Sequence, residues 1–238
     1  MIIASNQPWF SDWNYGLLTW LSRYLPHSNT TDDLAVFLIF NPIISSWIFA
    51  ACFYLLWTKN DDQQVRRRQY LIASFIAFCI SCLVTLVVRP WIHWPAPVVN
   101  GHFRHLFPSY FWAYGNYNSF PSHSTLAYFG VAVGLWPLNR RLSIFLAGFV
   151  LLFISLPRVY AGGHYPIDVL FSCVLAIVTL LAVWRWAPIE GLQSRWLNDQ
   201  KSFREVPNLL FFLWLFELGE GFRGLEFLAG VGRRLYMH

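Results

Sequence analysis

Five stretches of this chain are long and apolar enough to cross a lipid bilayer as helices. They cover residues 34–57, 69–88, 122–138, 142–157 and 166–186. A transmembrane helix needs roughly 20 apolar residues, and fewer where neighbouring protein shields it from lipid. Because lipid cannot satisfy irregular backbone, the pattern predicts an all-α polytopic membrane bundle with about five to six transmembrane helices.

The composition indicates that the bilayer is the solvent. Hydrophobic residues make up 56% of the 238 residues and charged residues only 12%, against roughly 25% in a soluble domain. We therefore expect one integral membrane domain over residues 1–238, with a catalytic core at about 69–187. The segments 1–33 and 203–238 are Trp-rich or interrupted by charge, which predicts interfacial or additional helices. The charged start also argues against a cleaved signal peptide.

The positive charge predicts an orientation in the membrane. A net charge of +5 could suggest nucleic acid, but the basic residues lie in short loops and form no recognition motif, so we expect no nucleic-acid partner. With five spans, ten basic residues fall on one face and four on the other. The positive-inside rule assigns the larger group to the cytoplasm and places the N-terminus outside. The larger group is Lys59, Arg66, Arg67, Arg68, Arg140, Arg141, Arg185, Arg195, Lys201 and Arg204, and the smaller is Arg23, Arg89, Arg104 and Arg158.

The four cysteines lie inside apolar stretches and lack the paired spacing of metal ligands. We expect small buried residues at these positions, with neither a disulfide framework nor a zinc site. They are Cys52, Cys79, Cys82 and Cys173.

Three short polar segments meet on the predicted outer face, and the segment from Arg158 to Asp168 is the most informative. His164 and Asp168 stand four residues apart at a helix start, so their side chains can meet. A carboxylate that accepts from one imidazole nitrogen fixes the tautomer and leaves the other nitrogen as a nucleophile. Arg158 precedes a Gly-Gly turn and suits bidentate phosphate binding. The segment predicts a phosphoryl-transfer site.

The other two segments are Val88-Arg89-Pro90 and the run from Phe120 to Ser124. Pro121 suits the first turn of a helix that Ser119 could cap. His123 and the amides around Ser122 would then lie at a positive helix terminus, where an anion is stabilised.

This pattern resembles the type 2 phosphatidic acid phosphatase superfamily of membrane lipid phosphatases, whose motifs are KxxxxxxRP, PSGH and SRxxxxxHxxxD. The resemblance covers about residues 82–168. It implies that His164 attacks phosphorus to form a phosphohistidine and that Asp168 orients it. Arg89, Arg158 and the Ser122 region would bind the phosphoryl oxygens, and His123 would protonate the leaving group. The resemblance implies no metal and no other cofactor.

The chain departs from the family pattern at two informative positions. Cys82 stands where the family has lysine, so one phosphate contact is missing or comes from the loop that holds His102, Arg104 and His105. The second motif reads Pro-Ser-His-Ser, so His123 lies one position early and Ser124 occupies the usual slot. His123 remains the predicted general acid, because a loop-to-helix junction can absorb the shift.

The preferred interpretation is a lipid phosphatase of the bacterial inner membrane with its site facing the periplasm or exterior. It would hydrolyse a phosphate monoester or diphosphate of a phospholipid or polyprenyl lipid, such as undecaprenyl diphosphate, taken from the lipid bilayer. Two alternatives stay open. One is a lipid phosphotransferase that uses the same histidine, and the other is a non-catalytic lipid-phosphate-binding membrane protein.

Overall fold

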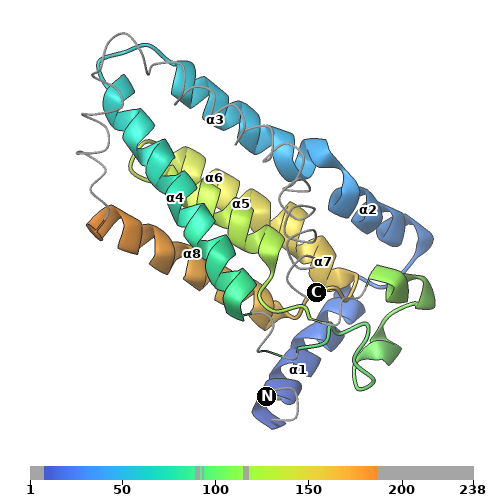
Figure 1. Cartoon of the computed structure of the whole chain (residues 1–238). Helices are drawn as coiled ribbons and strands as arrows, with labels where there is room; N and C mark the ends of the chain where they lie inside the picture. The colour runs from blue at the N-terminus through green and yellow to red at the C-terminus, as the bar shows by residue number, and fades with distance from the viewer. Residues whose placement is uncertain (1–7, 89–91, 93, 115–117, 187–238) are drawn as a thin grey trace, which may run out of the picture.

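The computed structural model describes residues 8–88, 92, 94–114 and 118–186, and helices form the regular framework of this part of the chain (Figure 1). The helical class predicted from the sequence is therefore confirmed. In chain order the elements are α1 (Pro8–Tyr24), α2 (Asn29–Phe40), the π-helix η2 (Ile43–Trp47), α3 (Ile48–Thr58), α4 (Gln64–Val88), the 3-10 helices η4 (Arg104–Leu106) and η5 (Ser109–Tyr114), α5 (His123–Gly134), α6 (Arg140–Phe149), the π-helix η6 (Val150–Ser155), α7 (Leu156–Tyr160) and α8 (Pro166–Trp186).

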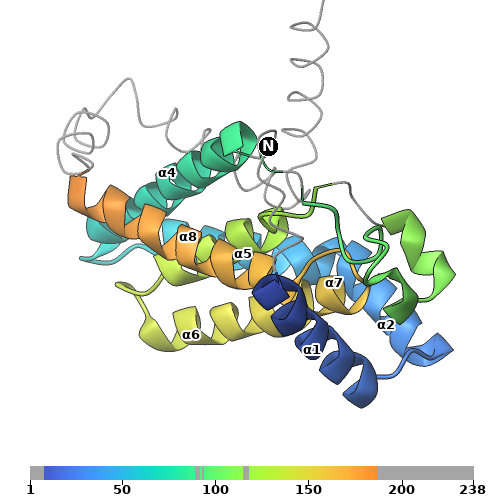
Figure 2. The same ribbon diagram turned by 90° about the horizontal axis from the view of Figure 1, so that it is seen from below.

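Helix α5 occupies the centre of the bundle. It packs against α4, α6 and α8, and the view from below shows it between α4 and α6 (Figure 2). Its 12 residues would span only about 18 Å. A helix this short can lie at membrane depth because its neighbours shield it from lipid, and most of its side chains are buried.

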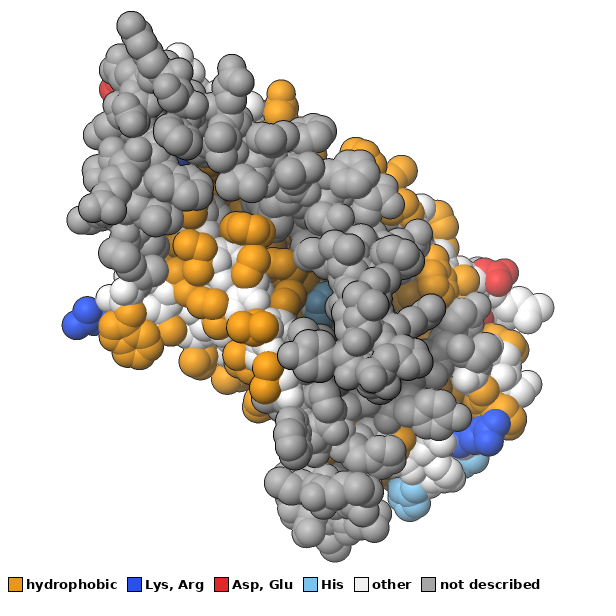
Figure 3. Space-filling model, in the orientation of Figure 1, with side chains coloured by type: hydrophobic (Ala, Val, Ile, Leu, Met, Phe, Trp, Pro, Cys, Tyr) orange, Lys and Arg blue, Asp and Glu red, His pale blue; other side chains and the backbone are white. Residues whose placement is uncertain are grey.

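Three helical segments of the described residues are long and apolar enough to cross a membrane. They are Gln64–Thr85, Arg140–Tyr160 and Pro166–Trp186. Large apolar side chains on these segments point outward, with Leu83, Phe145 and Val174 each more than half exposed. On the face shown in Figure 3, hydrophobic side chains cover the middle of the bundle and charged ones lie toward its ends. The chain is an integral membrane protein, while the count of five to six spans stays a prediction because residues 187–238 lie outside the described part.

The predicted span over residues 34–57 is wrong as one continuous helix. Helix α2 ends at Phe40, and Asn41 adopts an extended conformation with ψ of 112°. Pro42 follows, and a proline disfavours helical backbone in the residue before it. The chain then restarts through η2 into α3. The stretch predicted at 142–157, by contrast, continues without a break from α6 through η6 into α7.

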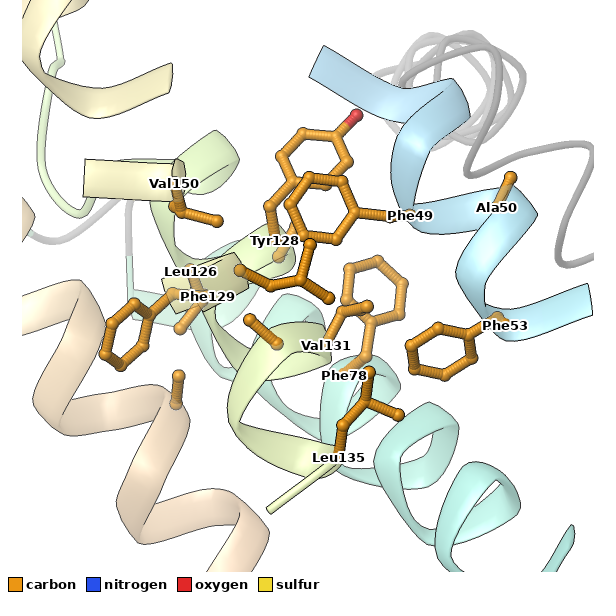
Figure 4. Packing of buried hydrophobic residues seen from close by; sticks show 14 of the residues in the cluster. Phe49, Ala50, Phe53, Phe78, Leu126, Tyr128, Phe129, Val131, Leu135 and Val150 are labelled. Atoms are coloured by element: carbon orange, nitrogen blue, oxygen red, sulfur yellow. The ribbon is translucent and has the colours of Figure 1, made fainter. Parts of the chain in front are cut away.

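The main core lies where α3, α4, α5 and α6 meet. Phe49 and Phe53 of α3 are completely buried, and the Phe49 ring lies against the Tyr128 ring of α5 with centroids 5.3 Å apart (Figure 4). Between membrane helices the hydrophobic effect adds little, so close packing stabilises such a core. Gly134 shows how close the packing is, because a Cβ atom there would lie 2.1 Å from the Ser74 hydroxyl oxygen of α4.

The turn between α3 and α4 is closed by a basic residue. Arg67 is only 5% exposed, and its guanidinium donates to the carbonyl oxygens of Leu56 and Lys59 and to the Asp61 carboxylate. The N–O distance to Asp61 is 2.8 Å. Arg67 therefore joins two helices, in addition to contributing to the charge at this end of the bundle.

A second cluster of buried side chains, which we call the cap, closes the opposite end of the bundle. Helices α1 and α2, the segment 94–111 and the turn after α7 all contribute to it. Figures 1 and 2 show α1 and α7 at this end, away from the start of α4 and the end of α8. The cap covers the segment in which the sequence predicts the site. Its buried members are Leu18, Leu21, Ala35, Trp94, Ala96, Val98, Phe103, Phe107, Phe111, Val159, Tyr160, Ala161, Tyr165 and Val169.

Candidate active site

The segment from Arg158 to Asp168 folds as a helix end, a tight turn and a helix start. Arg158 lies in α7, and its carbonyl oxygen accepts from the Gly163 amide at 2.9 Å. Gly162 has a φ of +72°, which glycine adopts without the strain that a side chain would bring. A Cβ atom at this position would lie 2.9 Å from Cβ of Val98 in the cap. The turn therefore needs glycine for its conformation and for its space.

His164 leaves this turn with one ring nitrogen already engaged. Its Nδ1 lies 2.9 Å from the main-chain carbonyl oxygen of Ser119, the residue just before the second motif. A carbonyl can only accept, so Nδ1 must carry the proton and donate it. The Nε2 atom then holds the lone pair that a nucleophile needs. The His164 side chain is 14% exposed, so the ring is largely shielded.

Asp168 is fully buried in the first turn of α8. Its Oδ2 accepts from the Tyr165 amide at 2.8 Å and lies 3.7 Å from Nδ1 of His164. The second distance is too long for a hydrogen bond. The sequence-based expectation that Asp168 accepts the imidazole proton is therefore wrong for this structure, in which Ser119 accepts it. The carboxyl group nevertheless lies close enough to interact with a positive imidazole.

The second motif begins its helix two residues later than the sequence predicts. Helix α5 starts at His123 with Ser122 at the N-cap position, and the Ser119 hydroxyl donates to the Trp94 carbonyl instead of capping a helix. The predicted start at Pro121 is therefore wrong, because the backbone of Ser122 is still extended.

Ser122 connects the second motif to the helix that leads into the third. Its hydroxyl lies 2.9 Å from that of Thr125, which lies 2.8 Å from the hydroxyl of Ser155 in η6. All three residues are buried. This chain of hydroxyl groups fixes the start of α5 against the segment that carries Arg158.

His123 lies beside the position where the resemblance places a lysine. Its Nε2 is 3.7 Å from Sγ of Cys82 in α4. The structure therefore brings α4 next to the second motif, and Cys82 supplies no positive charge there. Arg89, the arginine of the first motif, lies outside the described residues, and its role stays a prediction. The roles of His123 and Ser124 also stay predictions.

The Arg158 guanidinium is held by main-chain carbonyl groups. Nη1 donates to Ile154 at 2.7 Å and Nη2 to Ile39 of α2 at 3.4 Å. A guanidinium has five N–H donors, so these two bonds orient the group and leave further donors for an anion.

The sequence did not reveal the support that the cap gives to this turn. Tyr165 is 1% exposed, and its hydroxyl accepts from Nδ2 of Asn100 at 3.0 Å. Burial raises the pKa of Tyr165, and the bond from Asn100 offsets this only in part. The hydroxyl therefore stays protonated at neutral pH. Val98 adds a main-chain hydrogen bond of 3.0 Å to the Gly162 carbonyl.

Within the part of the chain that the structure describes, no three His, Cys, Asp or Glu side chains gather in a way that could hold a metal ion.

The chain is similar to two known proteins and to one family model. Undecaprenyl-diphosphatase BcrC of Bacillus subtilis (strain 168) is 27% identical over 177 residues, which cover 74% of this chain and 85% of that protein. The crystal structure of Aquifex aeolicus LpxE superimposes with a TM-score of 0.54 at 17% identity, covering 78% of this chain and 100% of that one, which shows a shared fold. The model of the PAP2 superfamily matches residues 95–191, a range that holds His123, Arg158, His164 and Asp168. The chain is therefore similar to the PAP2 superfamily over the segment that holds the candidate site.

Proposed function

We propose that this chain is a lipid phosphatase that hydrolyses a phosphate monoester or diphosphate through a phosphohistidine at His164. The observation that carries the proposal is the hydrogen bond from Nδ1 of His164 to the Ser119 carbonyl. It fixes the tautomer in which Nε2 is unprotonated, and the buried carboxylate of Asp168 lies 3.7 Å from Nδ1. These are the two conditions for a histidine that attacks phosphorus.

The reaction follows from these positions in two steps. The lone pair of Nε2 attacks phosphorus, the bond to the leaving oxygen breaks, and His123 gives that oxygen a proton. The phosphorylated ring is then cationic, and Asp168 stabilises it. A water molecule next attacks the phosphohistidine, loses a proton to His123 and releases inorganic phosphate. Arg158, Arg89 and the Ser122 region bind the phosphoryl oxygens, and no step needs a metal.

Two findings favour a polyprenyl diphosphate as the substrate and the outer face as the place of reaction. The similarity to an undecaprenyl-diphosphatase extends over most of the chain. The site also lies at the end of the bundle opposite the basic start of α4, which the positive-inside rule assigns to the cytoplasm. We therefore propose a bacterial inner membrane protein that acts on its lipid from the periplasmic or exterior side.

The test is release of inorganic phosphate by the full chain purified in detergent with EDTA present. The substrates are undecaprenyl diphosphate, phosphatidic acid and phosphatidylglycerol phosphate, and the variants are wild type and His164→Ala. We expect wild-type release with undecaprenyl diphosphate as the best substrate, and loss of at least about 10³-fold in the variant, because no other nucleophile replaces Nε2. Circular dichroism and gel filtration control for folding.

A second readout separates the proposed intermediate from other routes. Rapid acid-free quenching should trap phosphate on the wild-type protein in an acid-labile, alkali-stable form, and His164→Ala should carry none. Full activity in His164→Ala would refute the nucleophile. Phosphate transfer that requires an added lipid or sugar alcohol would favour the transferase, and phosphate binding without turnover would favour the non-catalytic protein.

A further inference from the structure

Asp32 is a carboxylate buried in the cap, away from the groups assigned to the reaction. It lies in the first turn of α2 and is 4% exposed. Burying a charged carboxylate is costly unless other groups compensate it. Burial raises the pKa of Asp32, but hydrogen bonds from Tyr110, Tyr160 and His27 outweigh this and hold the pKa below its usual value. The group is therefore a charged acceptor at neutral pH.

Three separate parts of the chain donate to this carboxylate. Nδ1 of His27, just before α2, lies 2.8 Å from Oδ1. The Tyr160 hydroxyl, at the end of α7, donates to the same oxygen at 2.5 Å. Tyr110 of η5 donates to Oδ2, and burial together with Asp32 raises the pKa of Tyr110 to about 12. We call these four residues the Asp32 cluster.

The Asp32 cluster is connected to the candidate site through α7. Tyr160 and Arg158 are two residues apart on this helix, so their side chains leave it about 200° apart. Both side chains nevertheless reach α2, where Tyr160 donates to Asp32 and Arg158 donates to the Ile39 carbonyl oxygen. The His27 ring also packs on the Tyr160 ring, with centroids 4.5 Å apart.

Helix α2 contacts α7 at both of these points. Asp32 binds Tyr160, and seven residues later, about 10 Å along α2, the Ile39 carbonyl accepts from Nη2 of Arg158. A shift of α2 along its axis would move both acceptors together. The position of the Arg158 guanidinium thus depends on the register between α2 and α7, which the Asp32 cluster sets.

We propose that Asp32 is a positioning residue, which holds α2 and α7 in register through Tyr160 and so places Arg158 for the phosphoryl group. The proposal rests on the proposed function only in taking a phosphoryl group as the ligand. Tyr110 extends the same restraint to η5, so the Asp32 cluster also fixes the loop segment beside the site.

The experiment measures the affinity for inorganic phosphate by calorimetry, together with KM and kcat for the best lipid substrate. The variants are Asp32→Asn, which removes the charge and replaces one of the two acceptor oxygens with an NH2 group that cannot accept, and Tyr160→Phe, which removes one hydroxyl. The matched control is Asp33→Asn, which removes the same charge from the neighbouring exposed residue. We expect the phosphate Kd to rise about tenfold in Asp32→Asn and about threefold in Tyr160→Phe, with KM following Kd, because a misplaced arginine loses a charge-assisted hydrogen bond.

A double-mutant cycle with Arg158→Lys tests whether Asp32 acts through the arginine. If it does, Asp32→Asn raises Kd less than about twofold in the Arg158→Lys background. Equal factors in both backgrounds, or an unchanged Kd in folded Asp32→Asn and Tyr160→Phe, would overturn the proposal and leave a role in stability alone.

Failure of the positioning role can be told apart from failure of the proposed phosphatase activity. Wild type that binds phosphate without releasing it from any lipid refutes the phosphatase, while the Kd comparison still decides the role of Asp32. Wild type that does not bind phosphate at all refutes the positioning role as well.

Discussion

Asp168 combines full burial with an incomplete set of hydrogen bonds. One oxygen accepts from the Tyr165 amide, and Oδ1 has no partner among the described residues. A buried carboxylate oxygen that accepts no hydrogen bond lowers the stability of the fold. Nδ1 of His164 lies 3.7 Å from Oδ2, which is close enough for the carboxylate to stabilise the ring when it becomes cationic.

We therefore predict that Asp168→Asn lowers kcat about 10²-fold and changes KM less than about threefold, because a neutral amide stabilises a cationic ring poorly. Steady-state kinetics on the best lipid substrate measures both constants. A change in KM at constant kcat would instead assign Asp168 to substrate binding.

Gly162 allows a second prediction at the scale of one residue. Alanine at a φ of +72° costs about 1–2 kcal/mol, and its Cβ atom would also press on Val98 and on the Phe107 ring. Gly162→Ala should thus lower the apparent Tm and reduce activity, since His164 follows two residues later. Gly148→Ala is the matched control, because no atom lies within 4 Å of its Cβ position in α6. Equal Tm values for the two variants would contradict the role of the turn.

The sequence predicted the part of the candidate site whose side chains lie close together along the chain. Arg158, His164 and Asp168 lie within one short segment, and local helix geometry brings the last two together. The partner of Nδ1 was not predictable, because Ser119 acts through its carbonyl group, which every residue has. The sequence did not single out Asp32 either, because its hydrogen-bond partners are as far away along the chain as Tyr160.

Among the elements, the predictable ones are those without a break in their backbone hydrogen bonds. The stretch predicted at 166–186 has the bounds of α8, and the stretch at 69–88 lies within α4. Hydropathy alone did not show the break at Pro42 or the π-helices, because these depend on backbone geometry rather than on polarity. The short α5 ends early because the chain turns after Gly134 toward the basic start of α6.

The turn between α3 and α4 gives a prediction that depends on pH. Hydrogen bonding to Arg67 lowers the pKa of Asp61 to about 2. A lowered pKa means that the carboxylate stabilises the fold above its unfolded pKa of about 4, and that this contribution is lost as the pH falls from about 4 to about 2. Asp61→Asn should therefore lower the apparent Tm at pH 7 but not near pH 2.

Thermal unfolding in detergent across this range measures the effect, with Asp62→Asn as the control. Asp62 is exposed and forms no ion pair among those found in the described residues. A Tm difference for Asp61→Asn that persists unchanged to pH 2 would mean that the ion pair with Arg67 does not stabilise the turn.

In the whole molecule, the basic residues and the candidate catalytic residues lie at opposite ends of the bundle. Lys59, the first turn of α4 and the start of α6 lie at one end of the bundle, and the turn that carries His164 lies with the cap at the other. The positive-inside rule acts on such an asymmetry during insertion. It predicts a cytoplasmic basic end and an outward-facing site, which is the orientation proposed above.

This orientation can be measured with two single cysteines in a chain whose four native cysteines are replaced by serine. His105→Cys lies in η4 beside the cap, and Asp62→Cys lies in the turn between α3 and α4; both positions are exposed. In intact cells a membrane-impermeant maleimide should label His105→Cys and leave Asp62→Cys unlabelled, whereas both should react after lysis. The reverse pattern would place the site in the cytoplasm. The charge asymmetry would then have failed to set the topology, and the lipid would have to be dephosphorylated on the inner leaflet.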